Sequence, residues 1–140
     1  MNDEQQQSRD ADLPPQVLVE LPAPFTDDRG SIQPLVDRTI ESCVLISSKK
    51  GSVRANHYHK TDWHYCYVLS GKIDYYYRET GGTGSVKKEC IETGKMFFTP
   101  PMIDHTMVFL EDTTFLAFGR NSRKQESYES GIERIPPLNL

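Results

Sequence analysis

The histidines are the residues of this chain whose type and spacing could do chemistry. Three of the four fall within residues 57–64, and the fourth follows the pair of prolines at 100 and 101. Imidazole is the commonest protein ligand for transition metals, and it also exchanges protons near neutral pH. The pattern predicts a site for one divalent transition metal, which could be Fe, Ni, Zn, Mn or Cu, with four ligands: His57, His59, His64 and His105. The alternative is that some of these rings only satisfy hydrogen bonds in a core.

Strand geometry suggests how four side chains so far apart in sequence could meet. Residues at i and i+2 point to the same face of a strand, so His57 and His59 would face one ion together. His64 would lie on the opposite face of an unbroken strand, so residues 60–63 must form a turn after which His64 opens the next strand. His105 must enter from another strand. The interior of a small barrel can bring all four together.

The elements that must position these residues are short. Runs of β-branched and aromatic residues recur about every ten residues, separated by turn signals, which is typical of a β-sandwich or small barrel. These runs cover residues 17–19, 31–36, 43–46, 65–69, 73–77, 96–98, 107–110 and 115–118. No stretch has a helical apolar period. The sequence therefore predicts an all-β fold, with residues 128–135 packed on the outside of the barrel.

Size and composition narrow the function classes. A chain of 140 residues supports one domain, and the polar residues 1–13 are expected to form a flexible tail before a domain over 14–140. The net charge of −4 argues against capture of nucleic acid or an anionic membrane. No apolar run could span a bilayer, and the start of the chain lacks the features of a secretory signal. The three cysteines lack metal-type spacing, so we expect free thiols and a cytoplasmic protein.

The first histidine segment resembles the first motif of the cupin superfamily, whose RmlC-like members are small barrels. Gly51, His57, His59 and Gly71 match that motif, and His64 stands where the family usually has Glu. The resemblance implies a single cupin barrel of the double-stranded β-helix, or jelly-roll, type. A site of neutral imidazoles leaves the full charge of a divalent ion uncompensated, which favours an anionic substrate or an enolate in the open positions.

The second histidine segment resembles the second cupin motif. Gly94, Pro100 and His105 match it, while Met102 replaces a Gly and Phe109 replaces an Asn. The two motifs together span residues 51–109, which is most of the expected barrel.

A further resemblance narrows the class of cupin. Residues 24–31 are similar to the opening of deoxysugar epimerases that act on nucleotide-linked sugars. Residues 53–60 are similar to a segment shared by those epimerases and by 3,4-ketoisomerases, with Ala55 where the family usually has Gly. The resemblance implies that His57 transfers a proton, a role that competes with metal ligation through the same nitrogen. Those enzymes generally work without a metal, so the four-histidine pattern departs from them.

Five other residues are candidates for contacts with a substrate. Arg54 could hold a phosphate, although strand alternation would point it away from His57 unless the backbone bulges. Tyr75 and Tyr77 share a strand face, and either phenol could act as a catalytic proton donor or stack on a sugar. Trp63 and Phe98 could line the mouth of the barrel and bind substrate. Ordinary packing, or a solvated surface position for Arg54, is the alternative in each case.

Three hypotheses for function follow. The first is an isomerase or epimerase that moves a proton next to the carbonyl of a keto-sugar nucleotide, with a metal or cationic histidine stabilising the enolate. The second is an iron-dependent dioxygenase, because four imidazoles on an octahedral ion leave two positions for substrate and O₂. The third is a non-catalytic module that binds a sugar or another small molecule. We also expect a homodimer, because cupins commonly pair terminal strands and residues 17–19 form an apolar run.

Overall fold

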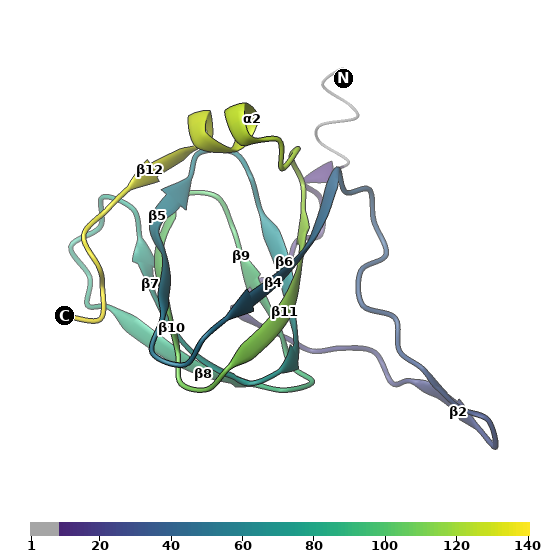
Figure 1. The fold of residues 1–140 in the computed structure, drawn as a ribbon. Helices are drawn as coiled ribbons and strands as arrows, with labels where there is room; N and C mark the ends of the chain where they lie inside the picture. The colour runs from purple at the N-terminus through teal and green to yellow at the C-terminus, as the bar shows by residue number, and fades with distance from the viewer. Residues whose placement is uncertain (1–8) are drawn as a thin grey trace.

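A computed structural model describes residues 9–140 and confirms the predicted all-β fold. Two five-stranded antiparallel sheets face each other and curve into a barrel (Figure 1). The first has the order β1-β9-β6-β11-β4, with β1 (Leu18–Val19), β4 (Ser42–Ser48), β6 (His64–Ser70), β9 (Met96–Thr99) and β11 (Thr113–Gly119). The second has the order β12-β5-β10-β7-β8, with β5 (Val53–His59), β7 (Lys72–Glu79), β8 (Lys87–Glu92), β10 (Ile103–Phe109) and β12 (Ile132–Arg134).

The core lies between the two sheets and follows from the alternation of side chains along the strands. In β11, every second residue from Thr113 to Gly119 is buried, which places Phe115 and Ala117 inside the barrel. The strand β9 is buried along its whole length, because Phe97 packs into this core while Met96 and Phe98 pack into a second cluster. One face of β9 is thus covered by the barrel interior and the other by the N-terminal part of the chain.

Gly71 joins β6 to β7 in a turn that no other residue type could make without strain. Its φ is 113°, and a Cβ at this position would lie 2.6 Å from the Cα of Thr113. Only glycine combines this backbone conformation with such a close approach. This explains the Gly at the end of the first histidine segment.

The segment before the barrel is held in place from Arg9 onward. The carboxylate of Asp10 accepts a hydrogen bond from the indole of Trp63 at 2.9 Å and another from Arg120 Nε at 2.8 Å. Leu13 packs against the second cluster. Residues 9–13 therefore belong to the packed domain rather than to the expected tail, of which residues 1–8 lie outside the described part of the chain.

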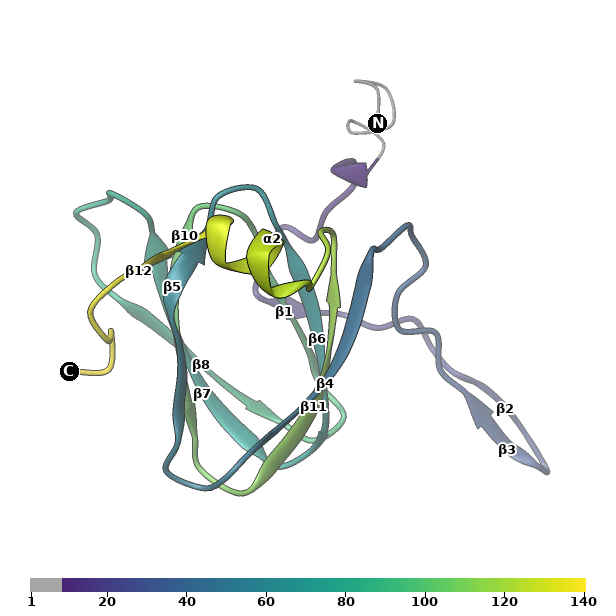
Figure 2. The ribbon, with the colours of Figure 1, turned by 45° about the horizontal axis from the view of Figure 1, so that its top comes forward.

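A short hairpin projects from the barrel. It consists of β2 (Phe25–Asp27) and β3 (Gly30–Ile32), and both views show it extending away from the two sheets (Figures 1 and 2). Phe25 and Ile32 lie opposite each other and are 61% and 67% exposed. The helix α2 (Gln125–Ser130) lies between β11 and β12 in the chain. No helix within residues 9–140 has both the length and the apolar character needed to cross a membrane.

Candidate functional site

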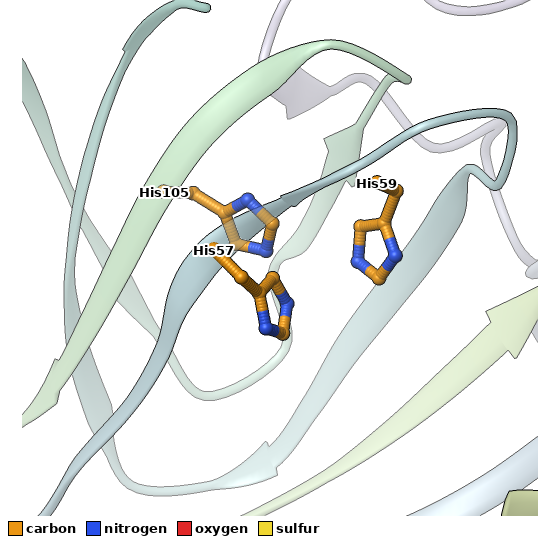
Figure 3. A group of neighbouring side chains, drawn as sticks. All are labelled: His57, His59 and His105. Carbon is orange, nitrogen blue, oxygen red and sulfur yellow. The ribbon is translucent and has the colours of Figure 1, made fainter. Parts of the chain in front are cut away.

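Three histidines meet inside the barrel. His57 and His59 come from β5, and His105 lies directly opposite His57 on the neighbouring strand β10. The ring centroid of His57 is 4.8 Å from that of His59 and 4.8 Å from that of His105 (Figure 3). All three rings are buried, and one ring nitrogen from each lies within 4.8 Å of the other two. The expected convergence of distant strands is thus present for these three residues.

The fourth histidine lies beside this group but is engaged elsewhere. The ring of His64 is centred 4.7 Å from that of His59, whereas its Nε2 is 2.8 Å from a carboxylate oxygen of Asp62. Asp62 is buried, and its other oxygen accepts the backbone N–H of Asn121 at 2.9 Å. His64 opens β6, as the turn between the two histidine strands predicted. It is therefore adjacent to the three clustered nitrogens without belonging to that group.

Burial keeps the clustered rings neutral. Removal from water lowers the pKa of His57 to about 3 and that of His105 to about 4, and it lowers the pKa of His59 even further. Neighbouring histidines add to the effect in each case, because two adjacent imidazolium charges would repel. At neutral pH all three rings consequently offer a lone pair.

The ring nitrogens could hold a divalent transition metal. Nδ1 of His105 lies 3.0 Å from the carbonyl oxygen of Ile103, which can only accept, so Nδ1 carries the proton and Nε2 is left with the lone pair. Nδ1 of His57 is buried without a hydrogen-bond partner among the described residues. A buried polar atom without a partner is costly, and a bound ion would satisfy it.

These histidines line a cavity of about 440 Å³. Three arginines line it, namely Arg54, Arg123 and Arg134, and no Asp or Glu of the described residues does. Ala117, Phe115 and Met107 supply an apolar wall. A cavity lined by neutral imidazole rings and guanidinium groups suits an anionic ligand.

Arg54 reaches this cavity because the backbone of β5 bulges. His105 pairs with His57 while Thr106 pairs with Ala55, which leaves Asn56 as an extra residue. Ala55 and Asn56 have φ values of 72° and 54°. The extra residue cancels the alternation that would have pointed Arg54 away from His57. Its guanidinium is held by Ser48 Oγ at 2.7 Å and by the Ser47 carbonyl at 3.1 Å.

The bulge gives a prediction about Ala55. A non-glycine residue in the left-handed region costs about 1–2 kcal/mol, which exceeds the entropy that glycine adds to the unfolded state. Ala55→Gly is therefore expected to raise the free energy of unfolding by about 0.5–1 kcal/mol. Urea denaturation of the two proteins measures this. Ala55→Val should lower the free energy of unfolding. A stabilising effect of valine would contradict the inference that the backbone is strained at residue 55.

The cavity is also lined by a residue that the sequence did not indicate. The helix α2 lies across one end of the barrel (Figure 2), and Tyr128 on it lines the cavity. Its ring centroid is 6.2 Å from that of His57 and 6.0 Å from that of His59. The guanidinium carbon of Arg123 lies 3.4 Å from the centroid of the same ring. Residues 128–135 thus do not simply pack outside the barrel as expected: the helical part closes its end, and only β12 extends the sheet.

Two of the remaining candidates are tyrosines of β7 that lie away from the cavity. Tyr75 is fully buried behind His105, on which its ring stacks at 5.9 Å, and its hydroxyl shares a hydrogen bond with Thr99 Oγ1 at 2.7 Å. Tyr77 is partly buried, and its hydroxyl donates to Glu89 at 3.5 Å. Neither side chain lines the histidine cavity.

Trp63 and Phe98 lie in the second cluster, on the outer side of the first sheet. Their ring centroids are 6.2 Å apart, and the N-terminal segment covers them. They support the strands that carry the histidines but do not line the cavity. Phe98 faces outward because its two neighbours on β9 face inward.

Comparisons with known proteins identify the fold. The chain matches no protein-family model and no curated protein. Among solved structures, a dTDP-4-dehydrorhamnose 3,5-epimerase from Sulfolobus tokodaii is 20% identical, with a TM-score of 0.69 over 86% of this chain and 77% of that one. The sugar 3,4-ketoisomerase QdtA from Thermoanaerobacterium thermosaccharolyticum, in complex with TDP, is 16% identical, with a TM-score of 0.63 over 84% and 85%. ChmJ, a 3'-monoepimerase from Streptomyces bikiniensis in complex with dTDP-quinovose, is 13% identical, with a TM-score of 0.69 over 85% and 69%.

Proposed function

Since the chain folds as an RmlC-like cupin barrel, we propose that it is an isomerase or epimerase of a keto-sugar linked to a nucleoside diphosphate. One observation carries the proposal: the cavity is lined by three arginines and by neutral imidazoles, and by no acidic residue of residues 9–140. A diphosphate supplies the matching negative charge, and the sugar beyond it would reach the histidines. The solved neighbours named for sugar epimerisation and ketoisomerisation, two of them in complex with TDP or a dTDP-sugar, support this substrate class.

Proton transfer in this proposal falls to groups whose hydrogen bonds suit it. His64 donates from Nε2 to Asp62, so the neutral ring has its lone pair on Nδ1, and the carboxylate would stabilise the ring once it accepts a proton. His57, the expected proton carrier, has a pKa of about 3 because of burial, which makes it a weak base at neutral pH. We therefore assign the base to His64, with Asp62 holding its orientation.

Tyr128 would act as the acid that donates a proton to the substrate, while His64 acts as the base. Burial raises the pKa of its hydroxyl, so the phenol stays protonated at neutral pH and can donate. Its ring packs edge-on against His57 and His59 from α2. Tyr128 and His64 line the same cavity, so a sugar bound there could meet both groups. A divalent metal bound by His57, His59 and His105 would polarise the carbonyl and stabilise the enolate.

Isotope exchange tests the proposed activity. In deuterated water, the protein with a panel of keto-sugar nucleotides is expected to place deuterium on the carbon next to the carbonyl, as measured by mass spectrometry. Tyr128→Phe should lower kcat by about 10²-fold with little change in KM, because the phenol acts in the transition state. Tyr75→Phe, a buried tyrosine outside the cavity, is the matched control. Absence of label and turnover across the panel would refute the activity and leave a sugar-binding module, which an intact co-purified ligand would identify.

A dioxygenase is the second candidate, because three histidine ligands would leave open positions on a bound metal ion. The three clustered histidines would occupy half of the positions of an octahedral ion, and the other half would remain for substrate and O₂. Oxygen uptake after addition of Fe(II) and a diketone or thiol would support this activity. Binding of Zn or Ni with no oxygen consumption under any of these conditions would exclude it.

We also propose that the protein is a homodimer in solution, with the projecting hairpin in the interface. A two-stranded hairpin is only marginally stable alone, and Phe25 and Ile32 expose their side chains to water in the single chain. The double variant Phe25→Asp, Ile32→Asp is expected to convert a dimer to a monomer in light scattering after size exclusion. Thr26→Asp on the same hairpin is the control. A monomeric wild-type protein at micromolar concentration would contradict the proposal.

A further inference from the structure

The β5 bulge is fastened from outside the barrel by the C-terminal segment. Thr106, on the outer face of β10, is fully buried beneath residues 135–138. Its hydroxyl donates to Asn56 Oδ1 at 2.9 Å and accepts the backbone N–H of Leu138 at 3.1 Å. The N–H of Ile135 donates to the carbonyl of Asn56 at 2.9 Å. The one extra residue of the bulge is therefore held through both its side chain and its backbone.

Such fastening is needed because the bulge is strained. Two consecutive non-glycine residues, Ala55 and Asn56, have left-handed φ values. Each costs free energy, so this conformation persists only where its surroundings enforce it. On the cavity side, the Arg54 guanidinium is fixed by hydrogen bonds to Ser48 and Ser47 of β4, an edge strand of the other sheet. The guanidinium of Arg54 reaches β4 only while the bulge keeps the Arg54 side chain on the cavity side of β5.

We propose that residues 135–138 act as a clasp that positions Arg54 through Thr106 and Asn56, and so sets the affinity of the cavity for a diphosphate. The proposal rests on the proposed function for the identity of the anion. Thr106 and Asn56 are positioning residues: Thr106 faces away from the cavity, and it acts through the bulge. The Thr106 hydroxyl connects the clasp to the bulge, because it donates to Asn56 in the bulge and accepts the N–H of Leu138 in the clasp.

Binding of inorganic pyrophosphate, measured by calorimetry, tests the clasp. Thr106→Val keeps the side-chain shape but leaves Asn56 Oδ1 without its donor and the Leu138 N–H without its acceptor. The dissociation constant is expected to rise at least about tenfold. Thr106→Ser keeps the hydroxyl and should bind like the wild type. In an Arg54→Ala background, Thr106→Val should have no further effect, because the residue through which it acts is gone.

Two outcomes would overturn the inference: unchanged affinity in Thr106→Val, or an equal loss with and without Arg54. Should Thr106→Val fail to fold, Leu138→Pro removes the clasp N–H while leaving the hydroxyl, and the same comparison applies. Wild-type protein that binds no pyrophosphate would count against the proposed function alone. The clasp is then decided by hydrogen exchange of the Arg54 Nε–H in ¹⁵N NMR, which should quicken at least about tenfold in Thr106→Val. Unchanged exchange would overturn the clasp.

Discussion

Alanine in place of His57, His59 or His105 is expected to lower the affinity for a divalent transition metal by at least about 100-fold. Each of these residues contributes one of three nitrogens that lie within 4.8 Å of one another. Loss of one leaves only two ligands, which cannot hold the ion against water and buffer. Metal content after dialysis against Zn, Ni and Fe(II) measures the effect, and far-UV circular dichroism shows whether each variant is folded.

His64→Ala is the matched comparison for these three variants. The sequence predicted His64 as a fourth ligand, whereas its Nε2 is hydrogen-bonded to Asp62. We expect this variant to retain most of the metal and to lose turnover, because it removes the proposed base. If His64→Ala lost as much metal as His59→Ala, His64 would be a fourth metal ligand. Failure of the wild-type protein to bind any of the three metals would refute the metal site itself.

The metal-free protein is expected to lose stability steeply as the pH falls below about 6.5. Burial sets the folded pKa of His57 at about 3 and that of His105 at about 4, below the value of an exposed imidazole. At a pH between the folded pKa and that of an exposed imidazole, each ring is neutral in the folded protein and protonated in the unfolded one. Unfolding therefore takes up one proton per ring in this pH range. The stabilisation is complete above about pH 6.5 and is lost as the pH falls toward the folded values. Each ring contributes about 1.4 kcal/mol per pH unit.

His59 adds to this dependence, since burial lowers its pKa further still. Three rings together predict a fall of about 4 kcal/mol per pH unit near pH 5, which is a large fraction of the stability of a small domain. Urea denaturation at pH 7, 6 and 5 measures it. His59→Leu removes one titrating ring and should reduce the slope by about 1.4 kcal/mol per pH unit. An identical slope in wild type and variant would show that the His59 ring does not remain neutral in the fold.

Most of the barrel could be predicted because its strands carry a local signal. The apolar runs at residues 43–46, 65–69, 73–77 and 115–118 fall in β4, β6, β7 and β11, and the run at 107–110 begins in β10 and ends one residue beyond it. The strand β8 was not predicted. Its sequence is Lys-Lys-Glu-Cys-Ile-Glu, it lies at a sheet edge, and only Ile91 and partly Glu89 are shielded from water. Charged residues suit an edge strand but give no apolar alternation.

The parts of the site that could not be predicted depend on contacts between distant segments. Tyr128 lies in a polar six-residue helix, and nothing in that stretch of sequence indicates that it lines the cavity. Arg123 belongs to a basic cluster that sequence reasoning could equally place on a solvated loop. Asp62 was read only as part of a turn. Its pairing with His64 depends on how the turn at residues 60–63 folds back, which a strand period does not specify.

The sequence by itself determined the barrel and the meeting of His57, His59 and His105, because a two-residue period and a distant third histidine allow few other arrangements. Tertiary structure decided the chemistry available to each ring. It paired His64 with Asp62, turned Arg54 into the cavity through the bulge at Asn56, and brought Tyr128 over the histidines. Hydrogen bonds, bulges and burial are set by which segments come into contact, and these contacts fix the protonation and direction of a side chain.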